Sequence, residues 1–361
     1  GAPDVLARRC RLDSAAARRL ESRNEAMAGK ALRVLGVAYK DLAMLPRELN
    51  SAALEQGLTF VGLIGMIDPP RPEVRTAVEQ CYAAGIKPVM ITGDHKLTAV
   101  AIARELNIYR PGDLALTGED LDFLPQEVLE QEVEKFSVYA RVSPEHKMRI
   151  VKAWQARGKV VAMTGDGVND APALKVADIG CAMGVTGTDV AKGAADMILT
   201  DDNFATIVGA VGEGRRIYDN IRKAIQFLLA SNMSEVLGVF VATLLGFTLM
   251  NPVHLLFINL ITDCFPALAL GLEKGEPDVM ERPPRPSDDG IFAGGLGWDI
   301  AYQGILITVI TLVSYIIGHC MEGGYFEMPK GVSDDGMTMA FLTMSMCEIF
   351  HSFNMLSLIH I

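Results

Sequence analysis

Residues 159–174 read KVVAMTGDGVNDAPAL, a short apolar run that leads into a turn rich in glycine and acidic residues. We predict a strand at Lys159–Met163 and a helix at Ala171–Val176. In open α/β sheets, ligands collect where strands end at their carboxyl side. The turn places Asp166 and Asp170 at such a strand end, and Mg²⁺ in proteins is commonly held by one or two carboxylates and water. The stretch therefore predicts a Mg²⁺ site at these two residues.

Strands and helices alternate on both sides of this stretch. Further strands are predicted at Phe60–Ile67, Lys87–Ile91 and Asp178–Met183. Helices are predicted at Pro72–Ala84, Leu97–Leu106 and Glu145–Arg157. This order predicts a parallel sheet with helices on both faces. A second polar turn, Thr92-Gly93-Asp94, follows one of the strands, and Lys147 can supply a point charge for a phosphoryl group.

The composition indicates a soluble part and a membrane part. Half of the 361 residues are hydrophobic, and the mean hydropathy is +0.25, which is high for a soluble enzyme. This apolar content excludes a disordered chain. A net charge of −11 without a basic block excludes a nucleic-acid partner. The six cysteines form no CxxC pair, which argues against a disulfide framework and a thiolate metal site.

Four long apolar stretches fill the C-terminal part. We predict membrane spans at about 224–250, 253–272, 297–318 and 337–359, each close to the roughly 20 residues that cross a ~30 Å hydrocarbon core. Basic residues flank the first span and the loop between the second and third, which predicts that the soluble part faces the cytoplasm. The first span continues the predicted helix at 212–223 and can act as a connecting rod.

Each span carries polar residues, which are costly inside a membrane and by default functional. The oxygen-bearing residues of three spans form one candidate set, namely Asn232, Glu235, Asn259, Thr262, Asp263 and Glu348. Oxygen ligands with several carboxylates suit Ca²⁺, suit Mn²⁺ less well, and do not suit copper or zinc. Ligand type alone leaves Mn²⁺ and Na⁺ open.

Four motifs resemble those of the P-type ATPases, which are ion pumps with a haloacid-dehalogenase-like phosphorylation domain. They are DPPR at 68–71, ITGD at 91–94, ARVSPEHK at 140–147 and TGDGVNDAPAL at 164–174. The resemblance runs from Gly1 to about Asn354. It implies an incomplete α/β, Rossmann-like phosphorylation domain followed by an all-α transmembrane domain. The implied divisions are a nucleotide-domain remnant at 1–60, the phosphorylation domain at 61–210 and the membrane domain at 211–361.

The resemblance also implies roles for single residues. Asp166 and Asp170 match the Mg²⁺-binding and structural acids of the family. Catalytic or phosphoryl-contacting roles are implied for Thr92, Gly93, Asp94, Lys147 and Asn169, and nucleotide-binding roles for Arg33, Arg71 and Arg141. Asp68 and Arg71 match the hinge between the nucleotide and phosphorylation domains.

The intramembrane pattern resembles the sarcoplasmic-reticulum-type calcium pumps. One calcium site of that family is matched by Asn232, Glu235, Thr262, Asp263 and Glu348, and a second by Asn259 and Asp263. The resemblance implies ATP-driven export of Ca²⁺ through an aspartyl phosphate, with protons moving back through the same carboxylates. ATP and Mg²⁺ are the implied substrate and cofactor. No obligatory subunit is evident, and a bacterial plasma membrane is the expected location.

One motif of the family does not occur in the sequence. DKTGT, which carries the phosphorylated aspartate, is absent, and the letters TGE, which serve dephosphorylation in the family, occur only at 117–119, between ITGD and ARVSPEHK. We therefore expect the C-terminal portion of a longer pump, with the missing N-terminal part of the same polypeptide as its partner. Alone, such a portion lacks the nucleophile and is expected to be inactive. Two other readings are a phosphatase fused to a membrane anchor and a non-catalytic membrane partner derived from a pump.

Overall fold

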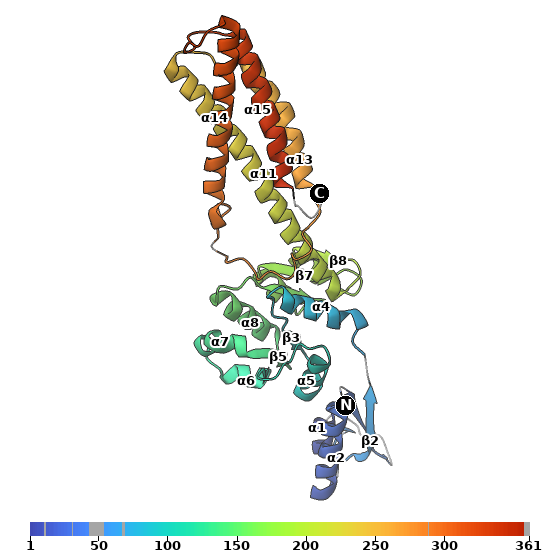
Figure 1. The fold of residues 1–361 in the computed structure, drawn as a ribbon. Coiled ribbons are helices and arrows are strands. Elements are labelled where there is room, and N and C mark those ends of the chain that lie inside the picture. Colours follow the sequence, from blue (N-terminus) through green and yellow to red (C-terminus); the bar gives the residue numbers. More distant parts are fainter. Residues whose placement is uncertain (11, 31, 43–53, 67–68, 288, 357–361) are drawn as a thin grey trace. The chain divides into compact units, whose positions relative to one another are not determined.

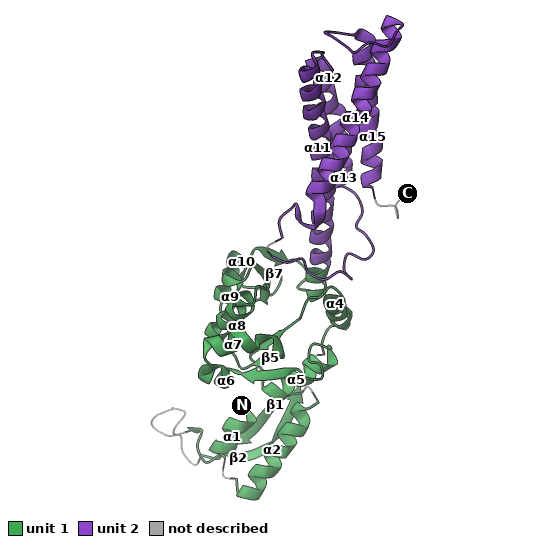
Figure 2. Cartoon of the chain, turned by 60° about the vertical axis from the view of Figure 1, so that its left-hand side comes forward, with its two compact units in different colours: residues 1–208 green, residues 209–361 purple. Residues whose placement is uncertain are grey.

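The computed structural model describes every residue except 11, 31, 43–53, 67–68, 288 and 357–361. The chain forms two compact units, residues 1–208 and residues 209–361 (Figure 2). Asp68 of the predicted hinge and the end of the predicted fourth span lie outside the described residues.

Unit 1, residues 1–208, alternates helices with short strands (Figure 1). Its strands are β1 (Arg33–Tyr39), β2 (Thr59–Met66), β3 (Met90–Thr92), β4 (Leu114–Thr117), β5 (Phe136–Ala140), β6 (Ala162–Gly165), β7 (Ile179–Met183) and β8 (Met197–Leu199). Its helices are α1 (Pro3–Arg9), α2 (Ser14–Ala28), α4 (Pro72–Ala83), α5 (Lys96–Glu105), α6 (Gly118–Phe123), α7 (Gln126–Glu132), the 3₁₀ turn η1 (Val133–Lys135), α8 (Pro144–Ala156), α9 (Ala171–Val176) and α10 (Asp189–Ala194).

The strands form two parallel three-stranded sheets, in the orders β3-β5-β4 and β6-β7-β8. The predicted parallel α/β fold is thus confirmed. β5 lies at the centre of its sheet and is buried along its whole length, although the sequence reading did not predict it. Helix α8 joins the two sheets, because Ile150 packs in the core beside β5 and Val151 packs in the core beside β6.

The strand predicted at Phe60–Ile67 was assigned to the wrong sheet. β2 pairs antiparallel with β1 in a separate two-stranded sheet. Its apolar side chains Val61 and Ile64 are exposed, whereas a strand of a covered parallel sheet is buried on both faces. β2 also spans residue 60, where the sequence analysis divides the first two domains.

Unit 2, residues 209–361, is helical. Its elements are α11 (Phe204–Leu245, which begins in unit 1), α12 (Pro252–Phe257), the π-helix η2 (Ile258–Asp263), α13 (Cys264–Gly271), the 3₁₀ turn η3 (Ala293–Gly295), α14 (Leu296–Gly323) and α15 (Asp334–Met355). α11 has 42 residues and is therefore about 63 Å long at 1.5 Å per residue. The predicted continuity of the first span with the helix before it is confirmed.

Three helical segments among the described residues are long and apolar enough to cross a membrane. They are Phe204–Leu245, Pro252–Gly271 and Ala293–Gly323. Helix α11 ends at Leu245, within the predicted first span 224–250, and the next residue, Gly246, has a φ of +85°. α15 does not meet these criteria, so the crossing of the fourth segment stays a prediction.

Helices α14 and α15 run side by side (Figure 1). Gly318 allows their close approach, since a Cβ there would lie 2.7 Å from the carbonyl oxygen of Asp335. At the same end of the unit, Tyr315 stacks on Phe247 with ring centroids 4.5 Å apart. These contacts bring α15 and its buried Glu348 against the other helices.

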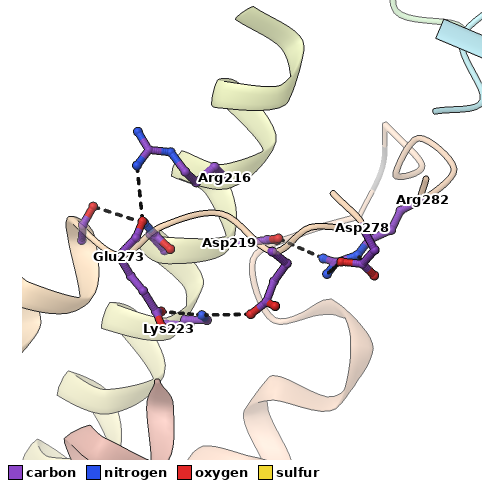
Figure 3. Close-up of polar contacts among 9 residues, drawn as sticks. Arg216, Asp219, Lys223, Glu273, Asp278 and Arg282 are labelled. Carbon is purple, nitrogen blue, oxygen red and sulfur yellow. Dashed lines mark hydrogen bonds and ion pairs between the residues drawn. The ribbon is translucent and has the colours of Figure 1, made fainter. Parts of the chain in front are cut away.

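A second set of contacts ties α11 to the segment between α13 and α14 (Figure 3). Lys223 pairs with Glu273 at 2.5 Å, and Arg282 pairs with Asp219 at 3.0 Å. Arg215 donates to the carbonyl oxygen of Arg282 at 2.8 Å. The basic residues that the sequence reading used for membrane orientation therefore also hold this connecting segment in place.

Candidate catalytic and ion-binding sites

The turn after β6 is built around Asp170. Its Oδ1 accepts a hydrogen bond from the Lys147 ammonium. Its Oδ2 accepts from the backbone N–H of Asp166 at 3.2 Å and of Gly167 at 3.0 Å. Gly165 has to be glycine in this conformation, because a Cβ there would lie 2.4 Å from the Cβ of Asp170.

Both oxygens of Asp170 are thus occupied, and only 6% of the residue is exposed. Burial raises its pKa, but the hydrogen bonds from Lys147 and Gly167 outweigh burial and hold the pKa below its usual value. Asp166 is exposed and makes no side-chain contact within the described part of the chain. Of the two predicted Mg²⁺ ligands, Asp166 therefore has a free carboxylate, while Asp170 organises the turn.

The turn after β3 holds the other predicted phosphoryl contacts. The Thr92 hydroxyl accepts from the backbone N–H of Asp94 at 3.1 Å and lies 3.3 Å from the Asp94 carboxylate. A Cβ at Gly93 would meet nothing within 4 Å, so its backbone is open to a ligand. Asn169, in the turn after β6, is exposed. Lys147 lies in the first turn of α8, which the Ser143 hydroxyl caps through the His146 N–H.

The three predicted nucleotide-binding arginines lie in different places. Arg141 follows β5 directly and has a positive φ of 51°; it is next to Ala140, which pairs with Thr92 of β3. Arg71 precedes α4 and donates to the carbonyl oxygen of Asp201 at 3.4 Å. Arg33 begins β1 in the separate antiparallel sheet. Arg141 therefore directly follows a strand of a parallel sheet, Arg71 contacts the segment that follows β8, and Arg33 lies in the separate antiparallel sheet.

In unit 2, two buried carboxylates from different segments of the chain meet at one serine hydroxyl. The Ser231 hydroxyl oxygen of α11 lies 2.8 Å from Oδ1 of Asp263 in η2 and 2.7 Å from Oε1 of Glu348 in α15, and its one proton is donated to one of the two at a time. The Thr262 hydroxyl lies 2.7 Å from the other oxygen of Glu348. Asp263 is 2% exposed and Glu348 is fully buried. These four side chains form one continuous polar cluster, which we call the acid cluster.

A second pair adjoins the acid cluster along α11 and η2. The Asn259 amide nitrogen lies 2.8 and 2.9 Å from the two oxygens of Glu235. Asn232, in contrast, is exposed, and its amide donates to the carbonyl oxygen of Leu228 in its own helix. The structure thus unites five of the six predicted ion ligands and leaves Asn232 turned away from them.

The π-helix places three of these residues. η2 contains Asn259, Thr262 and Asp263, and π-helical turns are frequent at functional sites. Pro266, four residues after Thr262, has no N–H to donate to the Thr262 carbonyl oxygen. The helix is therefore loosened beside the acid cluster.

The carboxylates of this region have neutral partners. Among the described residues, none of the ion pairs involves Glu235, Asp263 or Glu348, and one oxygen of Asp263 is buried without a hydrogen bond. No group of three His, Cys, Asp or Glu side chains in the described ranges is close enough to hold a metal by itself. Any cation held here would need the hydroxyl and amide oxygens as well.

Ser231 is the functional candidate that the sequence reading left out. It is fully buried and contacts both Asp263 and Glu348. Its spacing of four residues from Glu235 places both on one face of α11 and could have indicated it. A serine between apolar residues gives little signal, because a hydroxyl often bonds its own helix.

Comparisons with known families agree with both units. Residues 247–360 match the family "Cation transporting ATPase, C-terminus". Residues 9–178 and, separately, residues 147–210 match haloacid dehalogenase-like hydrolases. The chain therefore carries a haloacid dehalogenase-like part followed by a part that matches the C-terminus of cation-transporting ATPases.

Similar proteins over most of the chain are calcium-transporting P-type ATPases. The chain is 48% identical over 341 residues to "Calcium-transporting ATPase 1" of Bacillus cereus, which covers 92% of this chain and 38% of that protein. It is 48% identical over 365 residues to "Calcium-transporting ATPase" of Bacillus subtilis, with 98% and 40% covered. "Calcium-transporting ATPase 4, endoplasmic reticulum-type" of Arabidopsis thaliana is 42% identical over 312 residues, with 81% and 29% covered. The chain thus spans about two fifths of the length of its bacterial relatives.

Proposed function

We propose that this chain is the C-terminal part of an ATP-driven pump that exports Ca²⁺ from the cytoplasm through an aspartyl-phosphate intermediate. The names of the relatives support calcium as the transported ion. The observation that carries the proposal is the acid cluster with the neighbouring Glu235–Asn259 pair. A buried carboxylate that has no basic partner is costly unless a cation or a proton neutralises it.

The oxygen set suits the transported ion. Carboxylate, hydroxyl and amide oxygens are hard ligands, and Ca²⁺ accepts six to eight such oxygens at flexible geometry. The side chains come from α11, η2 and α15, so movement of one helix changes the distances between ligands. This arrangement supports release of the ion when the long helix α11 moves.

The same carboxylates are proposed to carry protons in the opposite direction. When the cation leaves, Glu235, Asp263 and Glu348 keep only neutral hydrogen-bond partners. Uptake of protons then removes the cost of uncompensated charge in a medium of low dielectric constant. Proton counter-transport follows from this exchange at one set of groups.

In unit 1, the strand ends are proposed to hold the phosphoryl group. Thr92, Gly93 and Asn169 offer hydroxyl and amide groups to its oxygens, and Lys147 offers a positive charge. Asp166, whose carboxylate is free, is proposed to hold Mg²⁺, with Asp170 keeping the turn in shape. Mg²⁺, when bound, neutralises charge on the transferred phosphoryl oxygens.

The nucleophilic aspartate is proposed to lie on a further strand between β3 and β6. Each of these strands is the edge of its own parallel sheet. Ile91 of β3 packs against the core beside β5 and also against the core beside β6. One added parallel strand would pair with both edges and bring its carboxyl end beside Thr92 and Asp166.

The test uses the full-length parent protein in membrane vesicles. Asp263→Asn should abolish Ca²⁺-dependent phosphorylation by ATP, because it removes a charged ligand from the acid cluster. Asp299→Asn is the matched control, since Asp299 is exposed at the start of α14. Normal calcium dependence in Asp263→Asn would overturn the assignment, and phosphorylation that follows Mn²⁺ or Na⁺ instead would change the transported ion.

A second test uses the 361-residue chain itself. Purified in detergent and mixed with ATP, Mg²⁺ and Ca²⁺, it should form no acid-stable phosphoprotein, because the sequence holds no DKTGT stretch. A stable acyl phosphate on this chain would contradict the proposed position of the nucleophile outside it.

A further inference from the structure

The loop at 184–188 connects β7 to α10 and reaches the turn that carries Asp166. The backbone N–H of Thr188 donates to the carbonyl oxygen of Asp166 at 2.8 Å. Asp166 lies between Gly165 and Gly167, and glycines leave a backbone free to rotate. The direction of the Asp166 carboxylate therefore depends on hydrogen bonds that hold its backbone, such as the one from Thr188.

The other end of this loop is held by Asp202. Its Oδ1 accepts from the backbone N–H of Val185 at 2.9 Å. Its Oδ2 accepts from the backbone N–H of Thr186 at 2.8 Å and from the Thr186 hydroxyl at 2.7 Å. The hydrogen bond from Val185, followed by those from Thr186, lowers the pKa of Asp202 to about 2, although desolvation opposes it. Asp202 thus stays an ionised acceptor at neutral pH.

The backbone of Asp202 is unusual for a residue other than glycine. Its φ is +50°, in the left-handed region that L-residues seldom adopt. Strained backbone of this kind persists where the surrounding contacts determine it, and it collects near functional sites. Here the conformation turns the carboxylate of Asp202 toward the loop.

The residues beside Asp202 fasten the same segment to two helices. The Asp201 carboxylate accepts from the Thr206 hydroxyl in the first turn of α11 at 2.5 Å. The Asn203 amide nitrogen donates to Glu73 in the first turn of α4 at 2.9 Å. Asp202 therefore projects from a fixed base at the junction of β8, α4 and α11.

We propose that Asp202 is a positioning residue for the proposed Mg²⁺ site. It holds the 184–188 loop so that Thr188 fixes the backbone of Asp166. Because it acts through Thr188 and does not touch the ligand, its loss should weaken Mg²⁺ binding without removing a ligand. This inference rests on the proposed function, since it concerns the Mg²⁺ requirement of the phosphorylation reaction.

The test measures the Mg²⁺ concentration that gives half-maximal phosphorylation by ATP in the full-length parent. Asp202→Ala should raise it about tenfold, in the range found when groups behind a metal ligand are lost. Asp202→Asn, which tolerates a positive φ and keeps one acceptor, should raise it less. Thr186→Val removes only the hydroxyl donor and provides a mild variant if the alanine variant does not fold.

The control is Asp196→Asn. Asp196 accepts a hydrogen bond from the backbone N–H of Gly180 in β7 at 2.8 Å. Among the described residues, it makes no hydrogen bond to the 184–188 loop. It should lower thermal stability without changing the Mg²⁺ requirement. Hydrogen exchange gives a second readout on the 361-residue chain, where Asp202→Ala should speed exchange at residues 184–188 and Asp196→Asn should not.

The outcomes separate the two proposals. If the wild-type parent forms no phosphoprotein in the presence of Mg²⁺ and Ca²⁺, the proposed function fails. If the wild type does so but all variants at Asp202 and Thr186 keep the wild-type Mg²⁺ requirement, the positioning role of Asp202 is wrong and the proposed function stands. An equal rise in the Mg²⁺ requirement of the Asp202 variants and of Asp196→Asn would also overturn the positioning role, because general destabilisation would then explain the rise.

Discussion

Asp170 in unit 1 and Glu348 in unit 2 are both buried carboxylates, and their partners differ in kind. Asp170 accepts from the Lys147 ammonium and from two backbone N–H groups. Within the described part of the chain, the hydrogen-bond partners of Glu348 are the hydroxyls of Ser231 and Thr262. In unit 1, the Lys147 side chain neutralises the charge of Asp170. In the acid cluster, the partners of Glu348 are uncharged hydroxyl groups.

The difference does not come from a lack of basic residues in unit 2. Just before the predicted first span, Lys223 pairs with Glu273 (Figure 3). That pair resembles Lys147–Asp170 in that each joins a lysine to a buried carboxylate. The contrast with the acid cluster lies within one unit, and the proposed function accounts for it by the charge of the transported cation.

The largest expected effect is a loss of calcium affinity when a basic side chain is placed beside the buried carboxylates of unit 2. Asn259→Lys would place an ammonium beside Glu235, which the Asn259 amide contacts in the wild type. Because the lysine competes with a divalent cation for the carboxylates, calcium affinity of the full-length parent should fall about 100-fold, or roughly 3 kcal/mol. Calcium-dependent phosphorylation measures this change.

Thr243→Lys is the matched control for this variant. Thr243 is exposed on α11, and its hydroxyl bonds its own helix. A lysine there can extend toward the membrane surface, so calcium affinity should stay unchanged. An equal loss of calcium affinity in both variants would show that a positive charge anywhere in the span disturbs the pump. That result would contradict a specific effect at Glu235.

An intermediate effect is expected when unit 1 loses its internal cation. Lys147→Met leaves Asp170 buried with backbone donors only, and the free energy of unfolding of unit 1 should fall by about 2 kcal/mol. The chain has two tryptophans, so in a Trp298→Phe background the fluorescence of Trp154 reports on unit 1 alone during urea unfolding. Lys152→Met, on the exposed side of α8, should change little.

The smallest effect is a pH dependence of the same unit. The pKa of Asp170 is lower in the folded state than in the unfolded chain. Its contribution to stability is therefore complete above about pH 4, the pKa of an unfolded aspartate, and is lost as the pH falls through the folded-state pKa. Urea unfolding at a series of pH values should show a weaker acid loss in Asp170→Asn than in the wild type. An identical loss in both would assign the acid sensitivity to other groups.

Local sequence patterns predicted much of unit 1 because its elements follow simple rules. Helix α9 occupies 171–176 as predicted, since an acidic turn before it and an alanine-rich run favour a helix there. β5, at the centre of its sheet, was missed because Phe136–Ala140 is short, and its alternation of Ser137 and Tyr139 with apolar residues is not the continuous apolar run expected of a strand that is buried along its whole length. β2 was predicted as a strand, but its antiparallel partner depends on distant pairing that a local pattern does not contain.

The two sites were likewise predicted from local patterns only in part. Spacing placed Asn259 and Asp263 on one segment, and the structure brings five of the six predicted ion ligands together. The side-chain direction of Asn232 depends on how α11 rotates against its neighbours, which spacing along one helix does not fix. The distinct roles of Asp166 and Asp170 likewise depend on the hydrogen bonds of the folded turn.

The most direct measurement is equilibrium binding of radioactive Ca²⁺ to the full-length parent without ATP, compared between wild type, Glu348→Gln and Glu273→Gln. Glu348 has neutral partners and Glu273 is already paired with Lys223. We expect saturable binding in the wild type, the same affinity in Glu273→Gln, and a loss of affinity of about 100-fold in Glu348→Gln. Wild-type affinity in Glu348→Gln would contradict the proposal that the acid cluster receives its positive charge from the transported ion.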